Sequence, residues 1–193
     1  MRKRRLRIFP VICLALIVVS FIALVSYLIW SLRQQDYPVE YEQIVQSVSV
    51  EQGVPEHIIY AVIYTESSFV PDAVSTMGAI GLMQILPDTA EWLAKREGIE
   101  YSDKMLTDPE YNIRLGTKYL KILYDKYSNW DAAHAAYHAG FSRVDSWLSE
   151  GIASFNTDGQ LTGIPIDSTS NYVNKIRLVR EKYFKQLEKM KKD

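Results

Sequence analysis

The sequence contains only one cysteine among its 193 residues, Cys13. An intrachain disulfide is therefore impossible, so cysteine usage is compatible with export but gives no positive sign of it. The chain also lacks internal repeats and low-complexity segments, and no two segments show the polar–apolar alternation of paired strands. These absences favour an all-α fold class.

Acidic residues are missing from the first 35 positions, which hold six Lys/Arg. Residues 36–193 hold 16 basic and 23 acidic residues, a net charge of −7. A domain with this excess of acid repels a polyanion, so nucleic acid is not expected as a partner.

Charged residues are also absent from residues 8–30. A helix of this length spans roughly 34 Å, enough for a bilayer core of about 30 Å. Tyr27 and Trp30 lie at its far end, where aromatic belts form, and the basic segment 1–7 predicts a cytoplasmic N-terminus. The sequence thus predicts an uncleaved transmembrane signal-anchor. The alternative is a cleaved signal peptide, but the apolar run is long and no small-x-small cleavage site follows it.

A polar stem over residues 31–37 leads to a predicted domain over residues 38–193. A domain of about 160 residues can bury roughly 70% of its surface around one core. Proline and cap residues at helix starts, glycine at helix ends and apolar periodicity delimit its elements. They predict helices over 38–53, 55–67, 82–85, 87–98, 108–123, 129–140, 143–148 and 170–189, with loops over 68–80 and 149–169.

Glu66 ends an apolar run, residues 58–64, that is expected to be buried on most sides. Desolvation disfavours the charged form of a carboxyl group, so the pKa of Glu66 should be raised. A raised carboxyl pKa suits a general acid near neutral pH. The alternative reading is a solvated glutamate at a helix end.

Two features after Glu66 favour the catalytic reading. The hydroxyl groups of Ser67 and Ser68 follow directly and could orient the carboxyl group. Gly78 and Gly81 then permit a turn with positive φ or a close approach to a ligand, which places Gln84 on a new element.

The pattern Glu66-Ser67, followed by Ala73-x-Ser75-x-x-Gly78-Ala79-x-Gly81-Leu82-Met83-Gln84, closely resembles the catalytic core of the soluble lytic transglycosylase family. Members have a lysozyme-like fold and cleave peptidoglycan. The resemblance implies an all-α, lysozyme-like domain preceded here by one transmembrane helix. It also implies Glu66 as the catalytic residue. The substrate-binding residues it implies are Ser67, Ser75, Met83, Gln84, Tyr137, His138 and Tyr172.

The sequence departs from the family pattern at two positions. Tyr137-His138-Ala139-Gly140 resembles the family's Ala-Tyr-Asn-Ala-Gly motif, with His138 in place of Asn. The resemblance implies that Tyr137 lies beside the catalytic glutamate and the sugar. Thr169-x-x-Tyr172 resembles a later family segment, where Ser168 replaces the usual Glu. Tyr172 is the second aromatic candidate for the sugar cleft.

His134 and His138 are four residues apart, a spacing that can hold zinc on a helix. Two ligands without a third are insufficient, and the Glu of the metalloprotease pattern is missing. Neither a metal nor another cofactor is therefore expected.

The family resemblance implies how a single acid could suffice. Glu66 would protonate the oxygen between MurNAc and GlcNAc and then accept a proton from the sugar's 6-hydroxyl group, which attacks C1 and closes a 1,6-anhydro ring. The expected partners are peptidoglycan strands and, through residues 8–30, the bacterial cell membrane, with the catalytic domain on its extracytoplasmic side. Two alternatives stay open: a hydrolase that uses water, and a non-catalytic wall-binding or assembly subunit.

Overall fold

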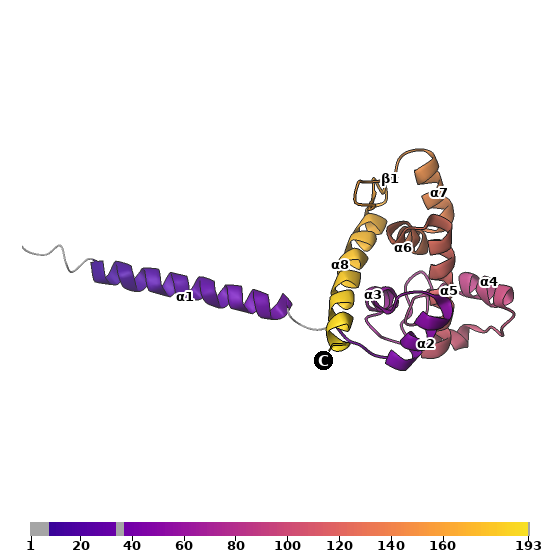
Figure 1. Ribbon diagram of the computed structural model, residues 1–193, viewed down its shortest axis with the longest axis horizontal. Helices are drawn as coiled ribbons and strands as arrows, with labels where there is room; N and C mark the ends of the chain where they lie inside the picture. Colours follow the sequence, from indigo (N-terminus) through magenta and orange to yellow (C-terminus); the bar gives the residue numbers. More distant parts are fainter. Residues whose placement is uncertain (1–7, 34–36, 193) are drawn as a thin grey trace, which may run out of the picture. The chain divides into compact units, whose positions relative to one another are not determined.

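The computed structural model describes the backbone of residues 8–33 and 37–192 (Figure 1). The predicted basic segment 1–7 and residues 34–36 of the predicted stem lie outside the described residues. The chain divides along its sequence into two units, each with its own internal contacts, with the boundary between Tyr37 and Pro38.

The first unit contains α1, Ile8–Arg33, which runs three residues beyond the predicted apolar segment. Its window Val11–Leu28 is long and apolar enough to cross a membrane, by length and composition, and none of the window is buried. A signal sequence near an N-terminus has the same character.

The second unit, residues 38–193, is mainly helical. Its α-helices are α2 (Glu42–Gln52), α3 (Glu56–Glu66), α4 (Pro87–Glu97), α5 (Pro109–Tyr127), α6 (Trp130–Ala139), α7 (Phe141–Ser149) and α8 (Asp167–Met190). The remaining elements are the 3₁₀ helix η2 (Asp103–Thr107) and the strands β1 (Ser154–Phe155) and β2 (Leu161–Thr162).

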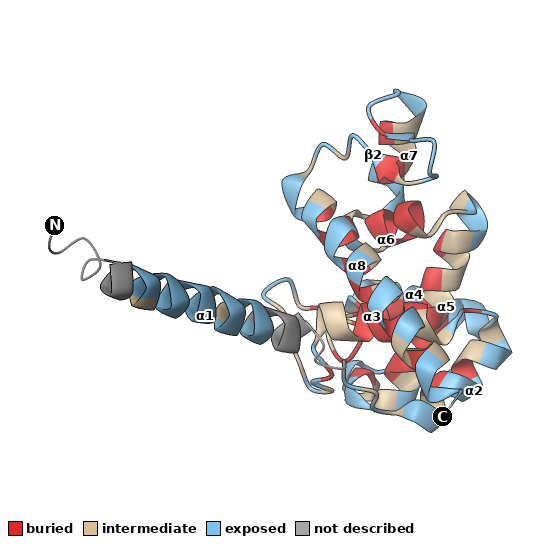
Figure 2. Cartoon of the chain, turned by 60° about the vertical axis from the view of Figure 1, so that its left-hand side comes forward, coloured by how far each residue is buried: buried red, intermediate tan, exposed pale blue. Residues whose placement is uncertain are grey.

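Helix α3 occupies the centre of this unit, where it packs against α8, while α6 packs against both α5 and α8. Every residue from Ile58 to Ile63 is buried. Figure 2 shows the buried residues concentrated on α3 and α6. Because α3 is enclosed almost to its end, its last residue, Glu66, emerges at the edge of the core.

The predicted helix starts at α5 and α6 are confirmed by their caps. The Asp108 carboxylate accepts a hydrogen bond from the Tyr111 N–H at 2.8 Å. The Asn129 side-chain oxygen accepts bonds from the N–H groups of Asp131 at 2.9 Å and Ala132 at 3.1 Å. Such bonds satisfy backbone donors that the helix itself cannot pair.

Two local predictions were wrong. Residues 82–85 form turns and an isolated bridge, Ile80–Ile85, rather than a helix. The predicted loop 149–169 contains an antiparallel hairpin that pairs Ser154 with Thr162 and Phe155 with Leu161. The Asn156 side chain organises the hairpin turn by accepting bonds from two backbone N–H groups. Strands of two residues are too short to show alternation in a sequence.

The loop between α3 and α4 is held in place by Asn112, a fully buried residue of α5. Its side-chain oxygen accepts a bond from the Met83 N–H at 2.7 Å, and its amide donates to the carbonyl oxygens of Ile80 at 3.0 Å and Leu106 at 2.8 Å. Gly81, with φ +84°, lets the loop approach this amide closely. One buried side chain thus holds three backbone groups, two in this loop and one in η2.

We expect Gly81→Ala to destabilise the domain by about 3 kcal/mol or more, since an added Cβ would collide with the Asn112 side chain and the Leu106 carbonyl oxygen. Gly78→Ala is the matched control, because Gly78 also has positive φ (+80°) but its Cβ would meet open space. Backbone strain alone should cost the control about 1 kcal/mol. Denaturant unfolding measures both changes, and equal losses would show that the close approach to Asn112 contributes nothing.

Candidate active site

Glu66 is the last residue of α3, and its carboxyl group is largely withdrawn from solvent. Burial raises the pKa of Glu66 to about 7, although the hydrogen bond from Tyr172 and the positive charge of Lys175 act in the opposite direction. The Tyr172 hydroxyl group, on α8, donates to Glu66 Oε1 at 2.7 Å. Near neutral pH the carboxyl group is therefore populated in both protonation states, as an acid–base catalyst requires.

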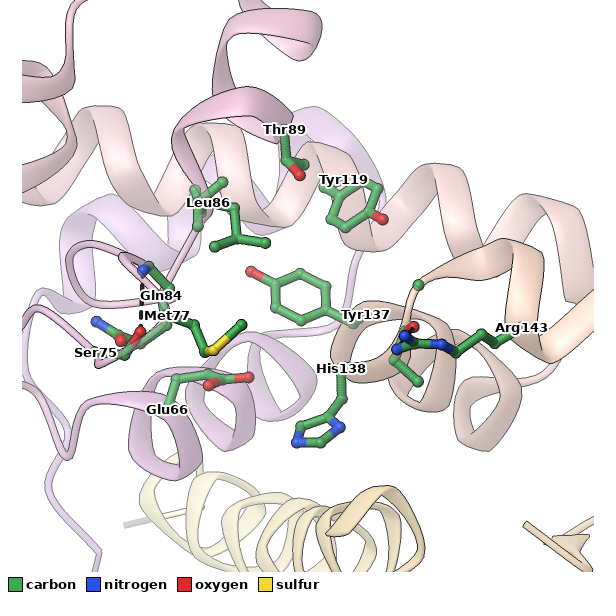
Figure 3. A pocket seen from close by; sticks show the side chains of 14 residues that line it. Glu66, Ser75, Met77, Gln84, Leu86, Thr89, Tyr119, Tyr137, His138 and Arg143 are labelled. Carbon is green, nitrogen blue, oxygen red and sulfur yellow. Dashed lines mark hydrogen bonds between the residues drawn. The ribbon is translucent and has the colours of Figure 1, made fainter. Parts of the chain in front are cut away.

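A pocket of about 420 Å³ opens in front of Glu66. Figure 3 shows the Glu66 side chain pointing toward the space bordered by Tyr137 and His138, with Ser75 and Gln84 beside it. Glu66 is the only acidic side chain among the described residues that line the pocket. Asp72, the nearest acid in the following loop, is exposed and lies outside the lining.

The side chains of Ser75 and Gln84 shape the loop that faces Glu66. The Ser75 hydroxyl oxygen accepts a hydrogen bond from the Ala79 N–H at 3.0 Å. The Gln84 amide donates to the carbonyl oxygens of Ala73 at 3.0 Å and Gly81 at 2.9 Å. Both residues line the pocket, so they stiffen its wall while remaining within reach of a bound molecule.

Ser67 and Ser68 do not orient the Glu66 carboxyl group, contrary to the sequence-based expectation. The Ser67 hydroxyl group donates to the carbonyl oxygens of Leu82 at 2.8 Å and Ile63 at 3.2 Å. The Ser68 hydroxyl group donates to the Tyr64 carbonyl oxygen at 3.4 Å. Ser67 therefore joins the end of α3 to the loop, and it is Tyr172 that contacts the carboxyl group.

Tyr137, near the end of α6, lines the pocket and also supports the loop. Its hydroxyl group donates to the Met83 carbonyl oxygen at 2.8 Å. Burial, and to a smaller extent the negative charge of Glu66, raises the pKa of the Tyr137 phenol, so this group stays protonated. Tyr119 of α5 packs on it with ring centroids 5.4 Å apart.

Met83 is placed differently from the expectation that it binds substrate. Its side chain is fully buried, and a Cβ added at Gly116 of α5 would lie 2.6 Å from its sulfur atom. The Met83 side chain therefore fills the core, while its backbone carries the bonds from Asn112 and Tyr137.

His138 lines the pocket opposite Glu66 and joins α6 to α8. Its Nδ1 lies 3.1 Å from the Thr169 hydroxyl oxygen, and its ring packs on that of Tyr172 with centroids 4.6 Å apart. Burial lowers the pKa of the His138 imidazole, which favours a neutral ring at neutral pH. Tyr172 itself is enclosed between His138 and Glu66 and is absent from the lining of the pocket.

His134 does not share a site with His138. It is fully buried on α6, stacks on Trp130 with centroids 6.0 Å apart, and has no hydrogen-bond partner for either ring nitrogen within the described chain. Burial and the charge of Arg180 lower the pKa of His134 to about 3, so the ring is neutral. Over residues 8–33 and 37–192, no group of three His, Cys, Asp or Glu side chains could hold a metal ion.

Sequence reasoning missed several residues that the fold brings to the pocket: Met77, Leu86, Thr89, Tyr119 and Arg143. Arg143 lies only three residues after Gly140, where α6 ends. This closeness to the motif Tyr137-His138-Ala139-Gly140 could have indicated that Arg143 lies at the pocket. The others lie on a loop and on α4 and α5, whose approach to Glu66 depends on tertiary contacts.

Residues 43–154 match the family described as Transglycosylase SLT domain. The chain belongs to this family. It is 32% identical over 160 residues to the soluble lytic murein transglycosylase of Escherichia coli K12, covering 81% of this chain and 25% of that protein. It is also 32% identical over 166 residues to membrane-bound lytic murein transglycosylase C of Haemophilus ducreyi, covering 75% of this chain and 45% of that protein. This SLT-domain chain thus spans only part of these relatives.

Solved structures confirm the predicted lysozyme-like fold. The 70 kDa soluble lytic transglycosylase of Escherichia coli aligns with a TM-score of 0.73 and 31% identity, over 78% of this chain and 25% of that one. A complex of the 70 kDa soluble lytic transglycosylase with bulgecin A gives the same values. An inactive variant of lytic transglycosylase Slt from Pseudomonas aeruginosa aligns with a TM-score of 0.70 and 30% identity, over 79% and 25% of the two chains.

We expect Tyr172→Phe to raise the pKa of Glu66 above about 7, because the lost hydrogen bond favours the carboxylate. Carbon-13 NMR of the Glu66 carboxyl group over a pH titration measures the change. Tyr119→Phe is the control, since Tyr119 lines the same pocket and its hydroxyl group makes no hydrogen bond with Glu66. A Glu66 pKa that is unchanged or lower in Tyr172→Phe would contradict this electrostatic account.

We also expect Glu66→Gln to stabilise the domain at high pH. Because the pKa of Glu66 is about 7 in the folded state and near 4.5 when unfolded, wild-type stability should fall between these values as pH rises. The free energy of unfolding of Glu66→Gln should exceed that of the wild type by on the order of 3 kcal/mol above pH 7. This pH-dependent advantage should be absent below about pH 4. Denaturant unfolding at several pH values tests this, with Asp72→Asn as the exposed-carboxyl control. A pH-independent difference would refute it.

Proposed function

We propose that the chain is a membrane-anchored peptidoglycan lytic transglycosylase that cleaves the β-1,4 bond between MurNAc and GlcNAc. The observation that carries the proposal is a pocket whose described lining holds one acid, Glu66, with a pKa of about 7. Both named relatives and the solved neighbours are named as lytic transglycosylases, which supports the proposal.

In the first step, the protonated Glu66 donates its proton to the glycosidic oxygen as the bond to C1 breaks. A carboxyl group with a pKa near the working pH is the most effective donor, because enough of it is protonated and the proton is still released readily. The Tyr172 hydroxyl group keeps one carboxyl oxygen engaged, which leaves the other oxygen to face the pocket.

In the second step, the Glu66 carboxylate accepts the proton of the sugar's 6-hydroxyl group. At the same time the oxygen of that hydroxyl group, O6, attacks C1. The new C1–O6 bond replaces the broken glycosidic bond, the proton returns to Glu66, and no water is consumed. Most glycosidases instead need a second carboxylate as nucleophile or base, about 5–10 Å from the first. The described pocket lining offers no such second acid, and a nucleophile within the substrate removes the need for one.

The remaining proposed substrate contacts follow from the pocket lining. Ser75 and Gln84 lie on one side of Glu66, and Tyr137 and His138 lie on the other. Their hydroxyl, amide and imidazole groups suit the hydroxyl and N-acetyl groups of the sugars. The Thr169 contact fixes the His138 ring and so supports a polar group where the family pattern has Asn.

Relatives named as membrane-bound and the apolar helix α1 suggest membrane association. We propose that α1 is an uncleaved, single-pass anchor with the N-terminus in the cytoplasm and the catalytic domain outside. The five Lys/Arg among residues 1–7, beside a span with none, support this orientation.

Analysis of muropeptides by mass spectrometry tests the reaction. We expect digestion of purified peptidoglycan to release products with 1,6-anhydroMurNAc ends, lighter by one water than hydrolysis products. Glu66→Gln should lower the rate at least about 100-fold, as expected for loss of a general acid–base. Asp72→Asn, which removes an exposed carboxyl group from the neighbouring loop, should retain full activity.

Two outcomes would overturn the proposal. Products with reducing ends would identify a hydrolase that uses water. Binding of glycan without released products, over a range of pH, would identify a non-catalytic wall-binding or assembly subunit.

A further inference from the structure

Charge is strongly segregated within the second unit. Residues 38–174 carry eight Lys/Arg and 19 Asp/Glu, whereas residues 175–192 carry eight Lys/Arg and two Asp/Glu. Half of the positive charge in the unit is therefore gathered on the last part of α8 and the residues that follow it. An otherwise acidic domain thus has one basic region.

Much of this charge lies on one face of α8. Tyr172, Val173, Ile176, Val179, Tyr183 and Leu187 are buried and define the inner face. Lys182, Lys185 and Lys189 are exposed and follow one another at intervals of three or four residues, which places them on one outer face. Lys192, also exposed, follows three residues later, just beyond the helix end at Met190. These four residues are called the lysine stripe. Figure 2 shows the outer side of α8 as exposed.

Exposed apolar side chains accompany the lysine stripe. Leu178 precedes it on the same face and is 65% exposed. Phe184, 51% exposed, lies farther round the helix, where its ring packs edge-on against His57 with centroids 5.2 Å apart. The acids Glu181 and Glu188 flank the stripe on one side, and they reduce its positive charge without cancelling it. Lysines with adjoining apolar side chains are typical of helices that lie on an anionic lipid surface.

The lysine stripe lies where the domain begins. Tyr183, between the first two lysines of the stripe, donates its hydroxyl hydrogen to the Pro38 carbonyl oxygen at 2.8 Å. Helix α1 ends at Arg33, and the five residue-to-residue steps from Arg33 to Pro38 can extend over at most about 18 Å. If α1 is a membrane anchor, the covalent chain keeps Pro38, and with it this part of α8, close to the lipid surface.

We propose that the lysine stripe docks the domain on the anionic phospholipid headgroups of the membrane that holds α1. The inference rests on the proposed anchoring. Three ammonium groups on one helix face, with a fourth just beyond the helix end, attract a negatively charged surface over about one Debye length, roughly 8 Å at physiological salt. Leu178 adds an apolar contact at the same surface. Docking would set the orientation of α8, and therefore of the pocket, relative to the membrane.

Lysine footprinting of the full-length chain in lipid nanodiscs tests the proposal. The chain is reconstituted in neutral phosphatidylcholine or in a mixture with anionic phosphatidylglycerol, and acetylation rates are measured by mass spectrometry. We expect the lysine stripe to react at least about threefold more slowly in anionic discs, and high salt to abolish this protection. Lys95 and Lys104, exposed on other elements, serve as internal references and should react equally in both lipids.

Matched double variants sharpen the test. Lys185→Gln with Lys189→Gln should return Lys182 and Lys192 to their rate in neutral discs, whereas Lys95→Gln with Lys104→Gln should leave the protection intact. Equal rates for the wild-type stripe in both lipids would overturn the proposal. Protection that appears in neutral discs only after addition of wall polymer would also overturn it, because the stripe would then bind another polyanion.

Muropeptide release from soluble glycan by the same samples separates this inference from the proposed function. The stripe variant should keep wild-type turnover, since its substituted lysines lie outside the pocket. Anhydro products without lipid-dependent protection would refute the docking alone. Lipid-dependent protection without anhydro products would refute the proposed reaction while upholding the docking.

Discussion

The desolvation of one carboxyl group is the constraint on which the site depends. Glu66 ends a helix that is enclosed almost to its last residue, so burial raises the pKa of its carboxyl group. The carbonyl groups at the end of α3 also disfavour a negative charge there. The hydrogen bond from Tyr172 and the charge of Lys175, both on α8, act against these effects. The packing of α8 on α3 therefore both buries the acid and supplies the groups that keep its pKa from rising further.

The pocket wall beside this acid is a loop with little regular structure, and its shape is imposed from other elements. Asn112 of α5 binds the Met83 N–H and two carbonyl groups, and Tyr137 of α6 binds the Met83 carbonyl oxygen. Both backbone polar groups of Met83 are thus satisfied by side chains from separate helices, while its own side chain fills the space at Gly116. Loops carry function well when a rigid scaffold positions them, and here two helices do so.

The sequence allowed prediction of the features that depend on local pattern. The apolar run before Glu66 predicted its burial and the direction of its pKa shift, and the cap residues Asp108 and Asn129 predicted two helix starts. Features that depend on distant contacts were not predictable in this way. Tyr172 reaches Glu66 across 106 positions, and Ser67 finds Leu82 rather than the neighbouring carboxyl group. The family resemblance marked Met83 as important but could not separate packing from substrate contact.

Helix α8 connects the site to the remainder of the domain through a buried ion-pair cluster. Asp131 of α6 is 2% exposed and accepts hydrogen bonds from the Arg177 guanidinium group at 2.6 and 3.1 Å. It also accepts a bond from the Leu161 N–H of the hairpin at 3.2 Å. The Arg180 guanidinium group lies 3.2 Å from the same carboxylate. Burying such charges costs about as much as their attraction returns, so the cluster specifies an arrangement more than it adds stability. It fixes α8 against α6, and hence Tyr172 against His138. Because the same helix carries the lysine stripe on its outer side, any contact that orients α8 also orients Tyr172 against Glu66.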